Sequence, residues 1–175
     1  HGHNVTLSRV LNAVRTWAKS INCVGAGISP DCNPFSALLC HRPGPNMLFD
    51  DDEPDGIVNL SPADRKRRDA AVELYGCCAL VARSTMEGED FSYTRKFVWW
   101  ETPPGRGFGS PWAVLGQEKH SPAFALTLMV ALVADLELSV VALDQGSFGA
   151  TAPKTTLIYC SRSVLPHMDE LLGTA

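Results

Sequence analysis

The segment Phe97-Val98-Trp99-Trp100-Glu101-Thr102-Pro103-Pro104-Gly105 has the clearest structural signature in the chain. Its aromatic and β-branched residues predict a strand, spanning Tyr93–Glu101, that is buried on both faces. The prolines end that strand, because proline has no backbone N–H to donate to a neighbouring strand. Glu101 is therefore expected at the carboxyl end of a buried strand, where partial desolvation favours the protonated carboxyl group.

Helices and strands alternate on both sides of this segment. The helices that apolar spacing predicts are Val5–Lys19, Ser61–Thr85 and Ala123–Leu136, and the other strands are Asn22–Ile28, Leu138–Leu143 and Thr155–Cys160. Asn4 or Thr6 is a candidate cap for the first helix, and Ser61-Pro62-Ala63-Asp64 is a typical start for the second. This order predicts an α/β fold: a largely parallel sheet with helices on both faces and a terminal antiparallel hairpin.

Length and composition narrow the possible classes. The 175 residues, 45% hydrophobic and 19% charged, suit a single globular domain spanning 1–175. Lys and Arg number 15 and Asp and Glu 19, so the formal net charge is −4, which is not the balance of an obvious nucleic-acid binder. The longest apolar run, Ala123–Leu136, is shorter than the roughly 20 residues of a membrane span. The chain begins His1-Gly2-His3-Asn4, without Met or a signal peptide, so we expect a processed product or a fragment.

The metal-binding patterns are incomplete. Six cysteines include no Cys-x-x-Cys pair, and Cys40-His41 lacks a second ligand pair at zinc spacing. The acidic run 50–53 lacks the alternating ligands and central glycine of a calcium loop. We therefore expect no metal site, thiols in a reducing compartment, and buried side chains at Cys23, Cys77 and Cys78. The basic run 65–68, flanked by acids, is interpreted as a solvated helix face.

Ligands of parallel α/β sheets bind beyond the carboxyl ends of the strands, which here are followed by the loops 29–36, 101–109 and 144–154. In the first loop, Cys32 opens a possible helix, whose amide groups would stabilise a thiolate nucleophile. Glu101 starts the second loop. In the third, Gln145 and Lys154 offer an amide and an ammonium group to orient a base or a phosphate. Trp99, Trp100 and Phe108 are candidate stacking surfaces, with core packing as the alternative for at least one Trp.

Taken together in this order, these residues resemble the catalytic half of the cytosine-5 DNA methyltransferase superfamily, and most closely divergent methylase-like sequences of phages and of algal or protist mobile elements. The family's nucleophile loop resembles Pro30-Asp31-Cys32-Asn33-Pro34-Phe35-Ser36, and its Glu-Asn-Val or Glu-Asn-Pro strand end resembles Trp100-Glu101-Thr102-Pro103. Asp144-Gln145, Gly149 and Lys154-Thr155-Thr156 resemble a later motif of the divergent branch. The likeness covers most of residues 20–160.

The resemblance implies a partial Rossmann-like sheet and a transferase mechanism. Cys32 would add to carbon 6 of a cytosine, protonated Glu101 would hold the ring nitrogen, and carbon 5 would receive a methyl group from S-adenosylmethionine. Ser36, Gln145 and Lys154 would act on the substrate side, and Pro30 and Asn33 on the cofactor side. The implied partner is DNA with a flipped-out cytosine, and the implied location is intracellular, nuclear in a eukaryote.

The chain also departs from the family pattern. Asp31 stands where the family usually has a second proline, and Asn33 where it has glutamine. Thr102 replaces an asparagine, and Lys154 lies where better-known members carry arginine. The glycine-rich loop and the acid that hold S-adenosylmethionine are missing before Cys32. The chain therefore resembles the family's second half, to be completed by an amino-terminal half or a second copy.

Two other functions stay open on the sequence. One is a truncated or inactive methylase-like domain that acts as a nucleic-acid- or partner-binding module. The other is a secreted copper enzyme that uses His1 as an amino-terminal ligand, with His41, His120 or His167 as the second ligand. The alternation of helices and strands disfavours the copper enzyme, because copper enzymes of that kind are β-sandwiches.

Overall fold

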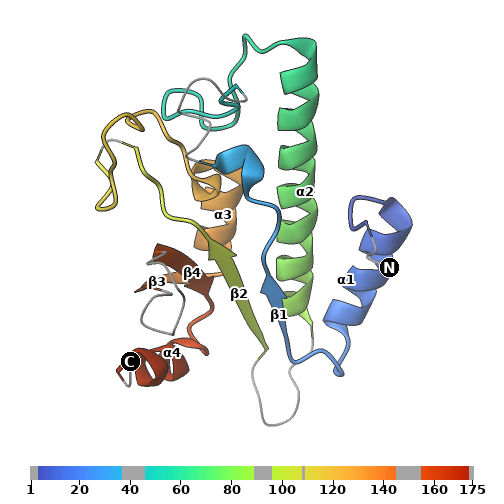
Figure 1. Ribbon diagram of the computed structural model, residues 1–175. Helices are drawn as coiled ribbons and strands as arrows, with labels where there is room; N and C mark the ends of the chain where they lie inside the picture. The colour runs from blue at the N-terminus through green and yellow to red at the C-terminus, as the bar shows by residue number, and fades with distance from the viewer. Residues whose placement is uncertain (1–3, 37–45, 89–95, 108, 145–154, 174–175) are drawn as a thin grey trace.

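A four-stranded mixed sheet with helices packed against it forms the centre of the α/β fold in the computed structural model (Figure 1). The structure describes residues 4–36, 46–88, 96–107, 109–144 and 155–173. In chain order the elements are α1 Ser8–Lys19, β1 Gly25–Ile28, the 3-10 turn η1 Asn33–Phe35, α2 Pro62–Glu87, β2 Phe97–Thr102, the 3-10 turn η3 Ala123–Ala125, α3 Thr127–Asp135, β3 Ser139–Asp144, β4 Thr155–Cys160 and α4 Leu165–Gly173.

The strand order across the sheet is β1-β2-β4-β3. β1 and β2 pair in parallel, with Ile28 opposite Trp100. β4 pairs antiparallel with both β2 and β3, so β3 runs in the same direction as β1 and β2. The terminal antiparallel hairpin is confirmed, but the expectation of a largely parallel sheet is wrong: among the described strands only β1 and β2 pair in parallel, because the returning strand β4 inserts between β2 and β3. Because β1, β2 and β3 share one direction, the loops that follow them begin at the same edge of the sheet.

One face of the sheet packs against α2 and α3 around an aromatic core. Trp100 is fully buried, and its ring centroid lies 5.7 Å from that of Tyr75 on α2 and 5.6 Å from that of Phe124 in η3. Phe124 in turn stacks on Tyr159 of β4 at 3.7 Å. These contacts, with Val98 on the same face, fix β2 beneath α2, so the strand's position depends on apolar packing as well as on its ladder.

The opposite face of β2 is packed differently. The expectation that this strand is buried on both faces is wrong: Val98, Trp100 and Thr102 are buried, whereas Phe97, Trp99 and Glu101 alternate with them and are half-buried. A methyl group added at Gly25 or Gly27 would lie 2.7 Å from the rings of Phe97 and Trp99, so these rings lie directly over the β1 glycines. Val164 and Met168, at α4, border this face, so helices are found on both faces as expected.

The start of α1 differs from the prediction. The capping residue is Leu7, with no side-chain cap, and Asn4 instead accepts hydrogen bonds from the backbone and hydroxyl of Thr6. The other end of α1 is held from a distant part of the chain: the ammonium of buried Lys96 donates to the carbonyls of Ala18 and Ser20 at 2.9 and 2.7 Å. A cation at this end complements the helix dipole.

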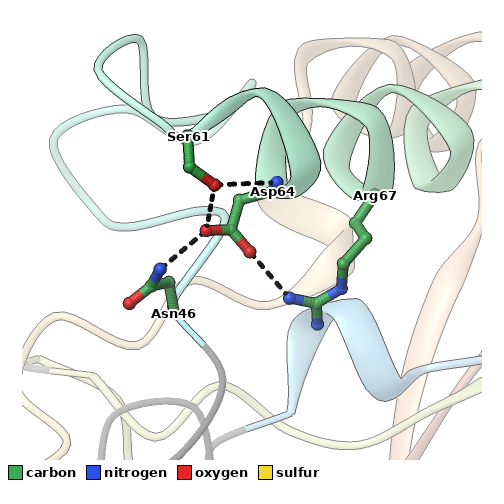
Figure 2. Close-up of polar contacts among 4 residues, drawn as sticks. All are labelled: Asn46, Ser61, Asp64 and Arg67. Carbon is green, nitrogen blue, oxygen red and sulfur yellow. Dashed lines mark hydrogen bonds and ion pairs between the residues drawn. The ribbon is translucent and has the colours of Figure 1, made fainter.

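The start of α2 is confirmed. Ser61 caps the helix by accepting the backbone N–H of Asp64 at 3.1 Å, and the Ser61 hydroxyl donates to the Asp64 carboxylate at 2.8 Å (Figure 2). Asn46 and Arg67 donate to the same carboxylate at 2.6 and 3.0 Å. The hydrogen bond from Asn46 is the largest cause of the lowered pKa of Asp64. The Ser61 hydroxyl thus satisfies one backbone N–H of the first turn of α2, and the Asp64 carboxylate joins Ser61, Asn46 and Arg67 around that turn.

The helix expected over Ala123–Leu136 is divided in two. The turn η3 ends at Leu126, whose extended backbone separates it from α3. The cap of α3 comes from another segment, because the Asp55 carboxylate accepts the Thr127 backbone N–H at 2.7 Å and the Thr127 hydroxyl at 2.6 Å. The apolar sequence around Leu126 does not indicate this break, because the carboxylate that caps α3 lies 72 residues away in the chain.

Candidate functional site

The loop after β1 carries Cys32 on a short turn at the surface. The Asp31 carboxylate accepts the Asn33 backbone N–H at 3.0 Å, and the Phe35 N–H donates to the Cys32 carbonyl at 2.9 Å. Cys32 is the N-terminal flanking residue of η1 and is exposed. The expected helix is a single 3-10 turn, so the helix start that we expected to stabilise a thiolate is shorter than predicted.

Phe35 anchors this turn in the core. Its side chain is 3% exposed, stacks on Phe49 with ring centroids 4.3 Å apart, and contacts Tyr75 edge-on at 4.9 Å. An exposed nucleophile candidate and a buried anchor are therefore only three residues apart. Because the anchor is rigid, the Cys32 backbone is held at a defined place beside α2.

Tyr75, which contacts Phe35, is affected by charged groups in and beside the Cys32 turn. Burial raises the pKa of its phenol, and negative charge at Cys32, Cys78 and Asp31 raises that pKa further. Tyr75 consequently stays a neutral phenol at physiological pH. Cys32 and Asp31 therefore lie close to Tyr75, at the end of the sheet where β1 stops.

Glu101 lies on the neighbouring strand, opposite Ile158 of β4, and is half-buried. The Ser29 hydroxyl donates to its Oε2 atom at 3.4 Å. This bond joins the residue that follows β1 to the end of β2, so the segments carrying Cys32 and Glu101 meet at one edge of the sheet. Ser29 was not predicted as a site residue, although the first residue after β1 in a parallel pair is a reasonable place to seek a partner for Glu101.

The two residues expected on the cofactor side lie in separate hollows. Pro30 borders a hollow of about 330 Å³ between the end of β1, α1 and α2, which is lined mainly by apolar groups such as Val14 and Leu74. Asn33 borders another, of about 310 Å³, together with Asp31 and Arg67. Asp31 and Leu74 line both hollows, so the two lie side by side at the end of β1 next to α2.

The remaining predicted residues are distributed as follows. Ser36 is half-buried, and its backbone N–H closes η1 by donating to the Asn33 carbonyl at 3.1 Å. Gln145, Lys154 and Phe108 lie outside the described residues. Trp100 is a core residue, which excludes it as a stacking surface for a base, whereas Trp99 is half-buried on the Glu101 face.

The basic run on α2 is partly neutralised. Arg67 pairs with Asp64, and Arg68 pairs with Asp69 at 2.7 Å while also donating to the Ile57 carbonyl at 3.0 Å. Figure 2 shows Arg67 extending from the helix toward the Asp64 carboxylate. Because Arg67 also borders the Asn33 hollow, the first turns of α2 lie beside the Cys32 turn.

The acidic run folds as a turn. The buried Asp50 carboxylate accepts the backbone N–H groups of Asp52 and Glu53 at 3.1 and 2.7 Å. Among the described residues, no group of three or more His, Cys, Asp or Glu side chains could hold a metal ion. His120, one of the candidate copper ligands, has both ring nitrogens bonded to backbone groups, at 2.9 and 2.8 Å, and so has no nitrogen left for a metal.

The five described cysteines are free thiols, and Cys40 lies outside the described residues. Cys23 and Cys77 are buried as expected, whereas Cys78 is only half-buried. Burial raises the pKa of Cys78 to about 11 and also raises that of Cys77. Both thiols are therefore protonated and unreactive near neutrality, and Cys32 is the exposed cysteine of the described chain.

None of the described helices has the length and apolar character needed to cross a membrane. A scan against family models, a search of curated proteins and a search of solved structures each found no match to this chain.

Proposed function

We propose that this chain is the base-activating part of a DNA cytosine-5 methyltransferase-like protein, with Cys32 as nucleophile and Glu101 as acid. The observation that carries the proposal is the shared edge of β1 and β2, where Ser29 bonds to Glu101 and the Cys32 turn follows directly. Addition to an aromatic ring needs a nucleophile and an acid that both reach one base, and here Cys32 follows one of two adjacent parallel strands while Glu101 lies near the end of the other.

The fold agrees with a partial Rossmann-like methyltransferase sheet, which we include in the proposal. Three strands share one direction, α2 links the parallel pair β1 and β2, and the chain ends in the β3–β4 hairpin. The insertion of β4 between β2 and β3 keeps the carboxyl ends of the parallel strands at one edge. A substrate bound there would lie at the points where the chain leaves β1, β2 and β3.

In the proposed reaction the Cys32 thiolate forms a carbon–sulfur bond to carbon 6 of cytosine. The π electrons of the C5–C6 bond shift into the ring as the Glu101 carboxyl group gives its proton to N3. Carbon 5 becomes nucleophilic and takes a proton from water. Loss of the original C5 proton to water, return of the N3 proton to Glu101 and departure of the thiolate restore the base.

Methylation needs a methyl donor, and the resemblance names S-adenosylmethionine, which supplies an electrophilic methyl group. The hollows that Pro30 and Asn33 border do not fit this cofactor by themselves, because each is lined mainly by apolar groups and Asp31 is the one carboxylate in either lining. We therefore assign the remainder of the cofactor site to a partner surface, either an amino-terminal half or a second copy. No step above depends on it.

The proposed substrate is cytosine in DNA, turned out of the helix at a cost of a few kcal/mol. Gln145 and Lys154 are proposed to orient the base or its backbone, and Ser36 to order the Cys32 turn. With a net charge of −4, the chain would bind DNA weakly and with strong dependence on salt. A DNA substrate also implies action inside the cell, in the nucleus of a eukaryote.

A second candidate is an inactive methylase-like module that binds nucleic acid or a protein partner. The mainly apolar linings of the Pro30 and Asn33 hollows favour it, since a domain that cannot complete a cofactor site has no methyl group to transfer. The two candidates differ in one measurable property, which is exchange of the cytosine C5 proton. The enzyme would activate carbon 5 of cytosine, whereas the inactive module would not.

The test uses proton exchange, which needs no cofactor. A DNA oligonucleotide with deuterium at cytosine C5 is incubated with the chain in water, and loss of deuterium is followed by mass spectrometry. Wild type and Cys78→Ser are expected to exchange at similar rates, because the Cys78 thiol is protonated, whereas Cys32→Ser should not exchange. Equal exchange by Cys32→Ser would exclude the nucleophile, and no exchange by folded wild type would favour the inactive module.

A second measurement examines the covalent bond and the cofactor. DNA containing a mechanism-based cytosine analogue should form an adduct with wild type that Cys32→Ser does not form, detectable as a band stable to denaturant. Calorimetric titration with S-adenosylmethionine then asks whether the chain alone binds the donor. Micromolar binding would exclude a separate amino-terminal half as the required partner surface, and would mean that the site is complete in this chain or is completed by a second copy.

A further inference from the structure

His120 is a buried histidine that bridges two loops. It is 4% exposed. Its Nδ1 accepts the backbone N–H of Arg106 at 2.9 Å, and its Nε2 lies 2.8 Å from the Phe35 carbonyl. Since Nδ1 accepts, Nε2 must carry the proton and donate to Phe35, so the ring is the neutral tautomer with both nitrogens satisfied.

The two bonded groups belong to the loops that carry the proposed chemistry. Phe35 is the last residue of η1, whose first carbonyl, that of Cys32, accepts the Phe35 N–H at 2.9 Å. Arg106 follows Glu101 by five residues, in the loop after β2. The imidazole therefore connects the Cys32 turn to the Glu101 strand end through two backbone groups.

His120 is itself held from other segments. Its backbone forms an isolated β-bridge with Asp50, and its N–H donates to the Gln117 carbonyl at 2.9 Å. The loop after β2 also packs tightly against it, because a methyl group added at Gly107 would lie 2.6 Å from the His120 carbonyl oxygen. A ring fixed in this way transmits its position to both loops.

We propose that His120 is a positioning residue that sets the Cys32 turn relative to Glu101 for addition to the cytosine ring. This inference rests on the proposed function. In a bridge made of one acceptor and one donor, removing either bond leaves a buried backbone group unpaired and frees the two loops to separate. Small displacements of reacting groups cost large factors in rate, on the order of 100-fold for about 1 Å.

The neutral form of the ring suits this role. Burial lowers the pKa of His120, and nearby Arg106 lowers it further, while the Phe35 carbonyl and the Asp51 carboxylate act in the opposite direction. Near pH 7 the ring thus keeps the lone pair on Nδ1 that the Arg106 N–H requires.

The experiment compares two substitutions at this position. His120→Gln keeps one acceptor and one donor about as far apart as the ring nitrogens, whereas His120→Leu fills similar space without either bond. We expect His120→Leu to lower the maximal C5 exchange rate by at least 10-fold. The DNA concentration that gives the half-maximal rate should change little. His120→Gln should recover most of the maximal rate. A purely structural role would lower the urea midpoint without this selective loss and rescue.

A further variant protects the test against misfolding of His120→Leu. Gly107→Ala leaves the ring intact but pushes the loop after β2 away from the His120 carbonyl, so its exchange rate should also fall. A wild-type exchange rate in folded His120→Leu would overturn the positioning role. If His120→Leu does not fold, a wild-type exchange rate in Gly107→Ala would overturn it instead. A His120→Gln variant that exchanges no faster than His120→Leu would also overturn it. Absence of exchange in wild type would overturn the proposed function itself, which is a different outcome.

Discussion

Glu101 and Cys32 lie at the same edge of the sheet but are held in place by different means. Glu101 belongs to a strand with partners on both sides, and its sequence neighbours Trp100 and Thr102 are buried on the opposite face. Cys32 belongs to a single 3-10 turn at the surface, held by the buried Phe35 side chain and by the His120 ring. The sheet therefore fixes Glu101, the proposed acid, while a few side-chain contacts fix Cys32, the proposed nucleophile. The Cys32 side should be the easier of the two to disturb.

The largest effect is expected from Glu101→Gln. Because the sheet register does not depend on this side chain, the variant should fold normally but exchange the cytosine C5 proton about 10²- to 10⁴-fold more slowly, the usual contribution of a general acid. The deuterium-loss assay measures this effect, with Glu73→Gln, on an exposed part of α2, as the control. An unchanged rate in Glu101→Gln would remove this residue from the mechanism.

Phe35→Ala tests how the Cys32 turn is anchored. Loss of a buried phenyl ring between Phe49 and Tyr75 should cost about 3–5 kcal/mol of the free energy of unfolding, measured by urea denaturation. Pro34→Ala, at the half-buried preceding position, is the control and should cost much less. If Phe35→Ala lowers the free energy of unfolding by less than about 1 kcal/mol, the Phe35 side chain does not anchor the Cys32 turn in the core. The Cys32 turn would then be held even less firmly, relative to the Glu101 strand end, than its contacts indicate.

Ser61→Ala weakens the first turn of α2, which borders the Cys32 turn and not the Glu101 strand end. Loss of the cap leaves the Asp64 N–H without its acceptor and should cost about 1 kcal/mol. Amide hydrogen exchange should then show lower protection in the first turn of α2 and unchanged protection in β2. Equal loss of protection in both segments would mean that the two sides are not independently supported.

The smallest effect concerns pH. The pKa of His120 in the folded chain is lowered mainly by burial, so its contribution to stability is complete above the unfolded value of about 6.5 and is lost as pH falls toward the folded value. The urea midpoint of wild type should therefore decrease from pH 7.5 to pH 5.5, and His120→Gln should reduce that decrease. A slope that is the same in both proteins would assign the pH dependence to other groups.

Local patterns predicted much of the fold. Ser61-Pro62-Ala63-Asp64 predicted the start of α2 because the capping groups lie within one turn of each other. The hairpin strand Thr155–Cys160 was predicted with its observed bounds, since its β-branched and aromatic residues carry a short-range signal. In both places the residues that carry the predictive signal are close in sequence and belong to the same helix or strand.

The failures involve contacts between distant segments. Lys96 holds the carboxyl end of α1, and Asp55 caps α3, across separations of 76 to 78 and 72 residues. The break at Leu126 was missed for the same reason. His120 was considered only as a copper ligand, because nothing in Lys119-His120-Ser121 indicates that its ring lies between Phe35 and Arg106, which are 85 and 14 residues away.

The candidate site likewise has features that the sequence indicates and features that only the tertiary structure shows. Residue type and order were enough to select Cys32 and Glu101, because a thiol after one strand and a carboxyl group at the end of another are local features of the chain. That the two segments meet through Ser29, that the Cys32 turn is a single 3-10 turn, and that His120 joins the two loops follow from the packing of strands and loops in three dimensions. Chemical identity is carried by each residue alone, whereas relative position depends on long-range contacts that no local pattern encodes.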